Sequence, residues 1–217
     1  MRWPLTWVLL AALTGLSSSV VLSAWLRWPR QWFVLGYAAA VSLFLGWFFR
    51  VAQVQPIVQL RRRWQGGLLG GLVLGAILAH GVAGQPRSTS PDGADLGWAL
   101  VWLGGVYGSL DALLLSVVPV LSVYGSRPAE VLRQAGARAR WGALALVASL
   151  GVTTAYHVGF EEFQSSAVAQ PLLGNGLLTT GYLLTGNPLT PVLGHVIMHG
   201  AAVLHGMDTT VQLPPHY

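Results

Sequence analysis

The feature that most constrains this chain is a succession of long apolar runs separated by short polar connections. A helix that spans a bilayer needs about 20 mostly apolar residues, and most of the runs are close to that length. The runs cover residues 4–26, 32–49, 66–84, 96–124, 141–160, 172–185 and 189–206. The pattern predicts an all-α polytopic transmembrane bundle of about seven helices, with six or eight as the nearest alternatives. We expect one integral-membrane domain over residues 1–217.

The composition supports a membrane location over a soluble fold. Hydrophobic residues make up 53% of the chain and charged residues only 9%, against roughly 25% charged in an ordinary soluble domain. Mean hydropathy is +0.58, and a water-soluble fold of this size cannot bury so much apolar surface. The chain has no cysteine, which excludes disulfides, thiolate metal sites and cysteine nucleophiles. The lipid bilayer is therefore the first expected partner.

The basic residues are all arginine, and their placement predicts an orientation. A net charge of +5 would suggest nucleic acid in a soluble chain, but these arginines lie between apolar runs, so we expect no nucleic-acid partner. Nine of them fall on the side of the amino terminus and three on the other side. The positive-inside rule then predicts a multi-pass cell-membrane protein with a cytoplasmic amino terminus and an outside carboxyl terminus. The first run is too long for a secretory signal, so we expect it to remain as a helix.

Two glycine series predict close helix packing. Gly67, Gly71 and Gly75 recur every four residues in the third run, and Gly104 and Gly108 do so in the fourth. Small residues at this spacing let helix backbones approach closely inside a membrane. The series serve packing within a chain and between chains equally well, so the oligomeric state stays open.

Asp111 is the most informative residue, because an ionisable group near the centre of an apolar run is costly in a bilayer. No arginine lies within helical reach of it, the nearest in sequence being Arg127. Such a carboxyl group must be protonated, paired across helices or bound to a cation. We therefore expect histidines from other helices to accompany Asp111.

Three histidines are the candidate companions. His195 and His199 are four residues apart, which places both imidazoles on one face of the seventh helix. His157 ends the fifth helix. Asp111, His157, His195 and His199 thus form the candidate catalytic constellation and the candidate metal-ligand set. Nitrogen and oxygen ligands without sulfur suit a divalent metal such as zinc, and the same groups also suit water activation without a metal, with Asp111 as base and the imidazoles stabilising an oxyanion.

Two segments resemble motifs of the CAAX protease and bacteriocin-processing (CPBP, or Abi) family of intramembrane proteases. Residues 183–195, followed by His199, resemble the last motif of that family, in which a helix entered through a short turn carries His-x-x-x-Asn. Residues 152–160 are similar to its Phe-x-x-x-His motif, and Asp111 lies where the family has Glu-Glu-x-x-x-Arg. The similarity covers about residues 97–206. The chain departs from the motifs at Ala112, Ser116, Thr153 and His199.

The resemblance implies a hydrolase of membrane-associated peptides, in which an acidic residue activates water and histidines assist. It also allows a relative without catalytic activity that binds a protein partner or lipid. A small proton or ion transporter, in which Asp111 and the histidines relay protons, is a third hypothesis. For residues 207–217, the sequence indicates only an extended segment set by Pro214 and Pro215.

Overall fold

The computed structural model describes residues 4–208 and 211–214, and these residues form helices and connections without a β-strand. The predicted all-α class is confirmed. Within the described residues, seven helical segments of 17 residues or more correspond one to one to the seven predicted runs. They are α1 (Pro4–Ser18) continuing into the π-helical η1 (Ser19–Trp25), α2 (Arg30–Val51), α4 (Trp64–Ala83), the composite helix from Gly93 to Gly125, α9 (Ala135–His157), α10 (Ala169–Thr185) and α11 (Leu189–His205).

The composite helix changes its winding several times. It consists of α5 (Gly93–Ala99), the π-helical η2 (Leu100–Tyr107), α6 (Gly108–Asp111), the π-helical η3 (Ala112–Val117) and α7 (Val118–Gly125). Four short helices lie in the connections between the long segments. They are α3 (Pro56–Arg61), α8 (Ala129–Arg133), η4 (Glu161–Phe163) and η5 (Ser166–Val168).

Four segments are long and apolar enough to cross a membrane. They are Pro4–Trp25, Arg30–Val51, Trp64–Ala83 and Gly93–Gly125, and Leu189–His205 is apolar but shorter. Large apolar side chains on their outer faces are exposed, for example Leu9 on α1 and Leu69 on α4. Such faces are stable against lipid but not against water. The chain is therefore a helical membrane protein.

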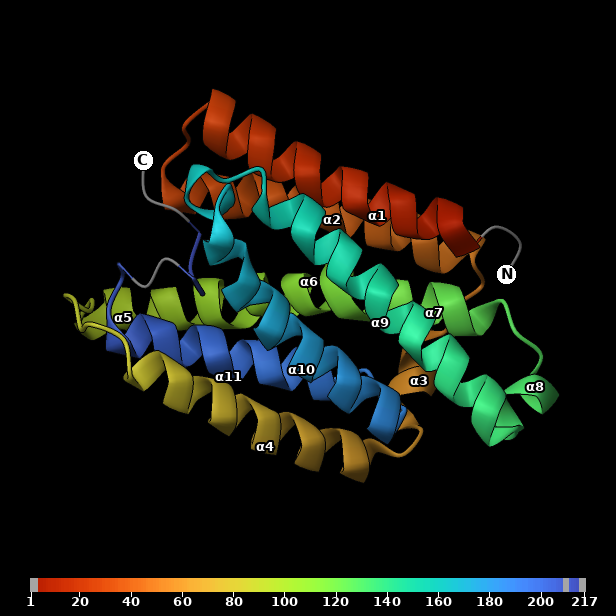
Figure 1. Ribbon diagram of the computed structural model, residues 1–217. Helices are drawn as coiled ribbons and strands as arrows, with labels where there is room; N and C mark the ends of the chain where they lie inside the picture. The colour runs from red at the N-terminus through yellow and green to blue at the C-terminus, as the bar shows by residue number, and fades with distance from the viewer. Residues whose placement is uncertain (1–3, 209–210, 215–217) are drawn as a thin grey trace.

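The long helices run back and forth between two ends of the bundle (Figure 1). We call one end the arginine end, since most of the arginines lie there, and the other the tail end. The arginine end carries the connections 52–63, 126–134 and 186–188, and the tail end carries the connections 26–29, 84–92 and 158–168. The tail end also carries residues 206–208 and 211–214, which we call the carboxyl-terminal segment.

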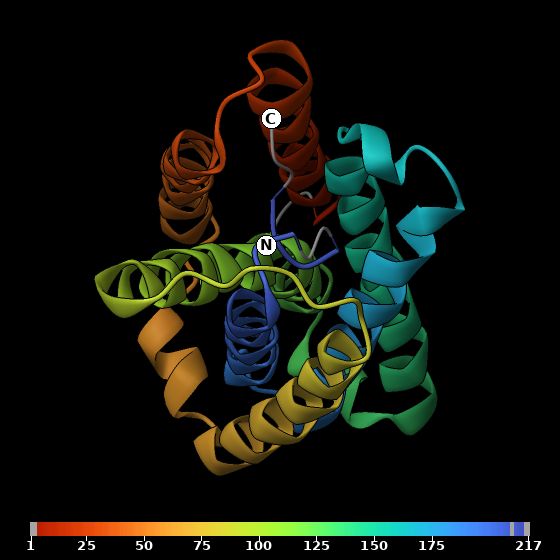
Figure 2. The same cartoon turned by 90° about the vertical axis from the view of Figure 1, so that its left-hand side faces the viewer.

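α11 lies inside the bundle, surrounded by α4, α10 and the composite helix (Figure 2). Both glycine series face it. A Cβ atom at Gly71 would lie 2.7 Å from Leu193 Cβ, and one at Gly104 would lie 3.2 Å from Gly200 Cα. The series thus pack helices within the chain, which is one of the two uses that the sequence left open.

The turn between α10 and α11 is anchored at the arginine end, and the two helices form an antiparallel hairpin. Gly186 ends α10 with φ +67°, a conformation that favours glycine. The buried Asn187 side chain accepts from Leu189 N at 2.7 Å and donates to Leu60 O at 2.9 Å. One amide therefore begins α11 and holds the end of α3.

Candidate functional site

Asp111 lies in the middle of the composite helix, between two π-helical stretches. α6 supplies only four residues before η3 begins at Ala112. A π-helical turn places more residues in each turn than an α-helix and is often found at functional sites. Near Asp111, the side-chain directions therefore differ from those that an uninterrupted α-helix would give.

The Asp111 carboxyl group has two partners from other helices. Tyr37 on α2 donates its hydroxyl hydrogen to Asp111 Oδ1 at 2.7 Å. The second oxygen, Oδ2, lies 3.6 Å from His199 Nε2 on α11. Asp111 is 4% exposed, so both contacts lie away from bulk water. The expected histidine companion is present, and the hydrogen bond to the carboxyl group comes from a tyrosine that was not among the predicted residues.

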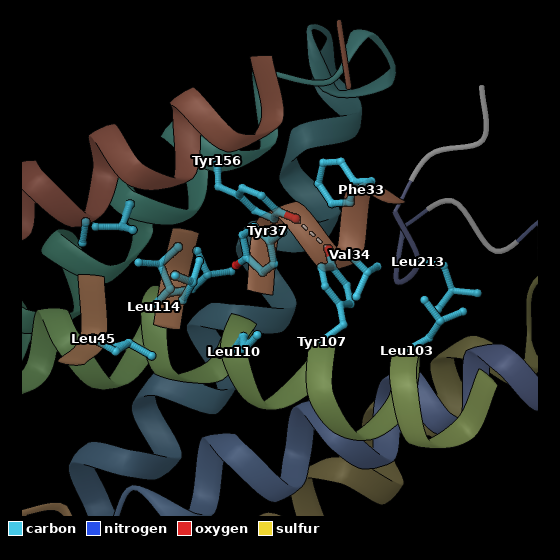
Figure 3. Close-up of a cluster of buried hydrophobic side chains, with 14 of the residues drawn as sticks. Phe33, Val34, Tyr37, Leu45, Leu103, Tyr107, Leu110, Leu114, Tyr156 and Leu213 are labelled. Carbon is cyan, nitrogen blue, oxygen red and sulfur yellow. Dashed lines mark hydrogen bonds between the residues drawn. The ribbon is translucent and has the colours of Figure 1, made fainter. Parts of the chain in front are cut away.

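Tyr37, which donates to Asp111, belongs to a cluster of three buried tyrosines (Figure 3). Tyr107 and Tyr156 share a hydrogen bond of 2.7 Å between their hydroxyl groups. The ring of Tyr37 lies 5.4 Å from that of Tyr107 and 5.3 Å from that of Tyr156. The cluster joins α2, the composite helix and α9 around one face of Asp111, and holds Tyr37 in place to donate.

His157 and His195 share the same local geometry. His157 Nδ1 lies 2.8 Å from Thr153 O, and His195 Nδ1 lies 3.0 Å from Pro191 O, each four residues earlier in its own helix. A carbonyl oxygen can only accept, so Nδ1 carries the hydrogen in both rings. In the neutral form, Nε2 of each ring then carries the lone pair that can accept a proton or bind a ligand.

His199 differs from both, because neither of its ring nitrogens has a hydrogen-bond partner among the described residues. Its side chain is nevertheless buried, with 2% of the residue exposed. Its ring lies 5.9 Å from that of His195 and is stacked on it, and 5.0 Å from that of Tyr107. A buried polar group without a partner is costly, so this imidazole needs a water molecule or ligand.

One cavity of about 600 Å³ is lined by all four predicted residues, Asp111, His157, His195 and His199. Its other walls come from the last turns of α4, the first turns of α10 and the carboxyl-terminal segment. Gln170 and Leu173 of α10 are exposed, so the cavity reaches the surface beside them. The four candidate residues therefore border one interior space, and their chemical roles remain predictions.

A hydroxyl and amide network borders this cavity and was not predicted. Asn175 on α10 accepts from Ser116 at 2.7 Å and donates to Thr153 at 2.6 Å. Ser149 donates to Leu115 O at 2.6 Å, a carbonyl that Pro119 cannot serve because proline has no N–H. Ser116 and Thr153, where the sequence departs from the family motifs, thus tie three helices together. The available signal was an amide in the middle of an apolar run, which is itself costly in a bilayer.

The arrangement of the four candidate residues does not support the metal hypothesis. Across residues 4–208 and 211–214, no group of three or more His, Asp or Glu side chains is arranged to hold a metal ion. Structural and catalytic zinc sites need at least three protein ligands, so the four residues do not fit zinc in this arrangement. The geometry supports chemistry carried by the side chains themselves.

Comparison of the chain with protein-family models, curated proteins and solved structures finds no match.

Proposed function

We propose that this protein is an intramembrane hydrolase that cleaves membrane-associated peptides, with Asp111 and His199 as its acid–base pair. The observation that carries the proposal is the buried imidazole of His199, which has no hydrogen bond to any described residue and lies 3.6 Å from the buried Asp111 carboxyl group in a common cavity. Titratable groups held together in a concave site are the usual signature of acid–base chemistry. The resemblance to the CPBP family motifs points to the same reaction.

The proposed reaction begins with a water molecule from the cavity that bonds to both Asp111 Oδ2 and His199 Nε2. The two atoms are 3.6 Å apart, too far for a strong direct hydrogen bond, and a water molecule beside them can bond to both. The pair takes a proton from this water as its oxygen attacks the carbonyl carbon of the peptide. The same proton is then given to the leaving nitrogen as the C–N bond breaks.

His157 and His195 have supporting roles in this reaction. Their Nδ1–H groups are held by backbone carbonyls, so each ring acts through Nε2. With the hydrogen on Nδ1, each neutral ring presents a lone pair at Nε2, which accepts a hydrogen bond from the attacking water or from the peptide N–H and orients it for the reaction. Tyr37 fixes the orientation of the Asp111 carboxyl group through Oδ1 and leaves Oδ2 for the water.

We also propose that the arginine end faces the cytoplasm and the tail end faces outward. Nine arginines against three support this orientation. One of the three, Arg30, is buried and donates to backbone carbonyls of the carboxyl-terminal segment, so it has a structural role at that end. A Gln164→Cys reporter in the 158–168 connection would react with an impermeant maleimide in intact cells. Reaction only after lysis would reverse the orientation.

The hydrolase proposal is tested with purified protein in nanodiscs and a set of quenched fluorescent membrane-anchored peptides. We expect cleavage that Asp111→Asn and His199→Ala each lower by about 100-fold or more, the effect of losing a general acid or base. Asp95→Asn and His80→Ala are matched controls, since both residues are exposed and lie outside the cavity. Cleavage that survives Asp111→Asn would refute the assignment.

A transporter would give a different result in the same variants. Proton or ion flux into liposomes that depends on Asp111, without cleavage of any peptide, would replace the hydrolase by a transport function. If both variants fold and neither flux nor cleavage is found, the non-catalytic binding hypothesis takes its place.

A further inference from the structure

The carboxyl-terminal segment, residues 206–208 and 211–214, lies against the tail end of the bundle. Gly206 ends α11 with φ +152°, and a Cβ atom there would collide with Ser88. Beyond this turn, Met207 N donates to Thr89 O at 3.1 Å and Asp208 N donates to Ser88 Oγ at 3.1 Å. The first part of the segment is therefore held against the 84–92 connection.

Arg30, at the start of α2, holds the segment at two separate points. Its Nη2 donates to Met207 O at 2.7 Å and its Nε donates to Pro214 O at 3.0 Å. Hydrogen bonds from a charged group are among the stronger ones in proteins, and Arg30 is 8% exposed, so water competes weakly. Between these points, Leu213 is 2% exposed and belongs to the same buried cluster as Leu103 (Figure 3).

Two residues between the anchored points form part of the cavity wall. Val211 and Gln212 line the same cavity as Asp111 and His199. Gln85, just after α4, donates from Nε2 to Gln212 Oε1 at 3.3 Å, which is a long and therefore weak hydrogen bond. The wall is thus held by strong contacts at Arg30 and Leu213. Across the cavity itself, it is held by the weak hydrogen bond between Gln85 and Gln212.

We propose that the carboxyl-terminal segment is a movable wall of the binding site, and that its opening gives polar ligands a second route to Asp111, from the tail end, besides the opening beside Gln170 and Leu173. The attachment to Arg30 sets how often this entrance opens. The weak bond between Gln85 and Gln212 suits a ligand with amide groups, because a peptide group can replace each half of it. The entrance requires only the cavity, so it stands whether or not the site hydrolyses peptides.

The absence of cysteine from the chain makes this inference directly testable. Met198 lines the cavity, so Met198→Cys places a single thiol inside it. A charged maleimide cannot enter from lipid, so the rate of labelling in nanodiscs reports opening toward water. With the native segment we expect a basal rate set by the opening beside Gln170 and Leu173, and Arg30→Gln should raise this rate by about tenfold or more because it removes hydrogen bonds from a charged group.

Three comparisons make the result specific. Leu213→Ala removes the other anchor and should also raise the rate, so the test does not depend on the folding of one variant. Arg27→Gln makes the same change at an exposed arginine of the same connection, and should leave the rate unchanged. Ala145→Cys places a thiol in the buried interior of α9 and should stay unlabelled throughout.

The inference is overturned if neither Arg30→Gln nor Leu213→Ala speeds the labelling of Met198→Cys. It is equally overturned if Ala145→Cys speeds up in parallel, because the variants would then loosen the whole bundle. Labelling that responds as expected in protein that cleaves no peptide would reject the proposed function and keep the entrance.

Discussion

The close contact between α4 and α11 predicts that Gly71→Ala destabilises the protein. The added Cβ would lie 2.7 Å from Leu193 Cβ and 3.2 Å from the carbonyl oxygens of Leu189 and Thr190, whereas ordinary contact begins at 3.4 Å. Leu193 Cβ is fixed to its own backbone and cannot swing aside, so the two helices must move apart. Overpacking of this kind costs about 1–3 kcal/mol.

Alanine also favours the helix over glycine, by up to about 1 kcal/mol, but this gain is shared by any helical glycine, so Gly71→Ala should be less stable than such a control by about 1–3 kcal/mol. Thermal unfolding in detergent, followed by tryptophan fluorescence, should show a melting temperature lower than that of the control by roughly 2–12 °C. Gly151→Ala is the matched control, because a Cβ at Gly151 in α9 has nothing within 4 Å, and it should leave the melting temperature equal or higher. Equal behaviour of the two variants would refute the packing argument.

Two further predictions concern the polar contacts of the interior. Tyr37→Phe leaves Asp111 Oδ1 without its donor and should lower the free energy of unfolding by about 1–3 kcal/mol, measured by thermal unfolding. The loss should be smaller when Asp111→Leu is already present. An equal loss in that background would contradict the pairing of Tyr37 with Asp111. Ser149→Ala removes the donor to Leu115 O and should cost about 1 kcal/mol. In a Pro119→Ala background the loss should be smaller, since an N–H at position 119 can serve the same carbonyl, and equal losses would argue against the compensation.

The membrane spans could be predicted from sequence because bilayer thickness fixes the length of an apolar run. The first helical segment ends at Trp25 against a predicted 26, and α11 spans Leu189–His205 against a predicted 189–206. The largest difference is in α9, which begins at Ala135 where the sequence predicted 141. Its first turns carry Arg138 and Arg140, and hydropathy cannot show that a charged stretch continues a helix beyond the apolar core.

The candidate site could be predicted from the sequence only in part. The cost of burying charge selects Asp111 and the histidines from sequence alone, because it depends on residue type and position within a run. The partner Tyr37 lies 74 residues away, and only packing of α2 against the composite helix brings it to Asp111. The π-helical stretches could not be predicted either, since they shift side-chain directions without any change in composition.

Packing and chemistry depend on the same glycines in this protein. A Cβ atom at Gly108 would lie 3.0 Å from His199 Cδ2 and 3.2 Å from His195 O, and Gly108 begins the four-residue α6 that Asp111 ends. The glycine thus allows α11 to come close enough for His199 to face Asp111. Helix association in a membrane relies on close van der Waals contact, and here the same contact sets the 3.6 Å separation of the proposed acid–base pair. The Gly104–Gly108 series, which packing alone would have explained, is therefore also a condition for the site.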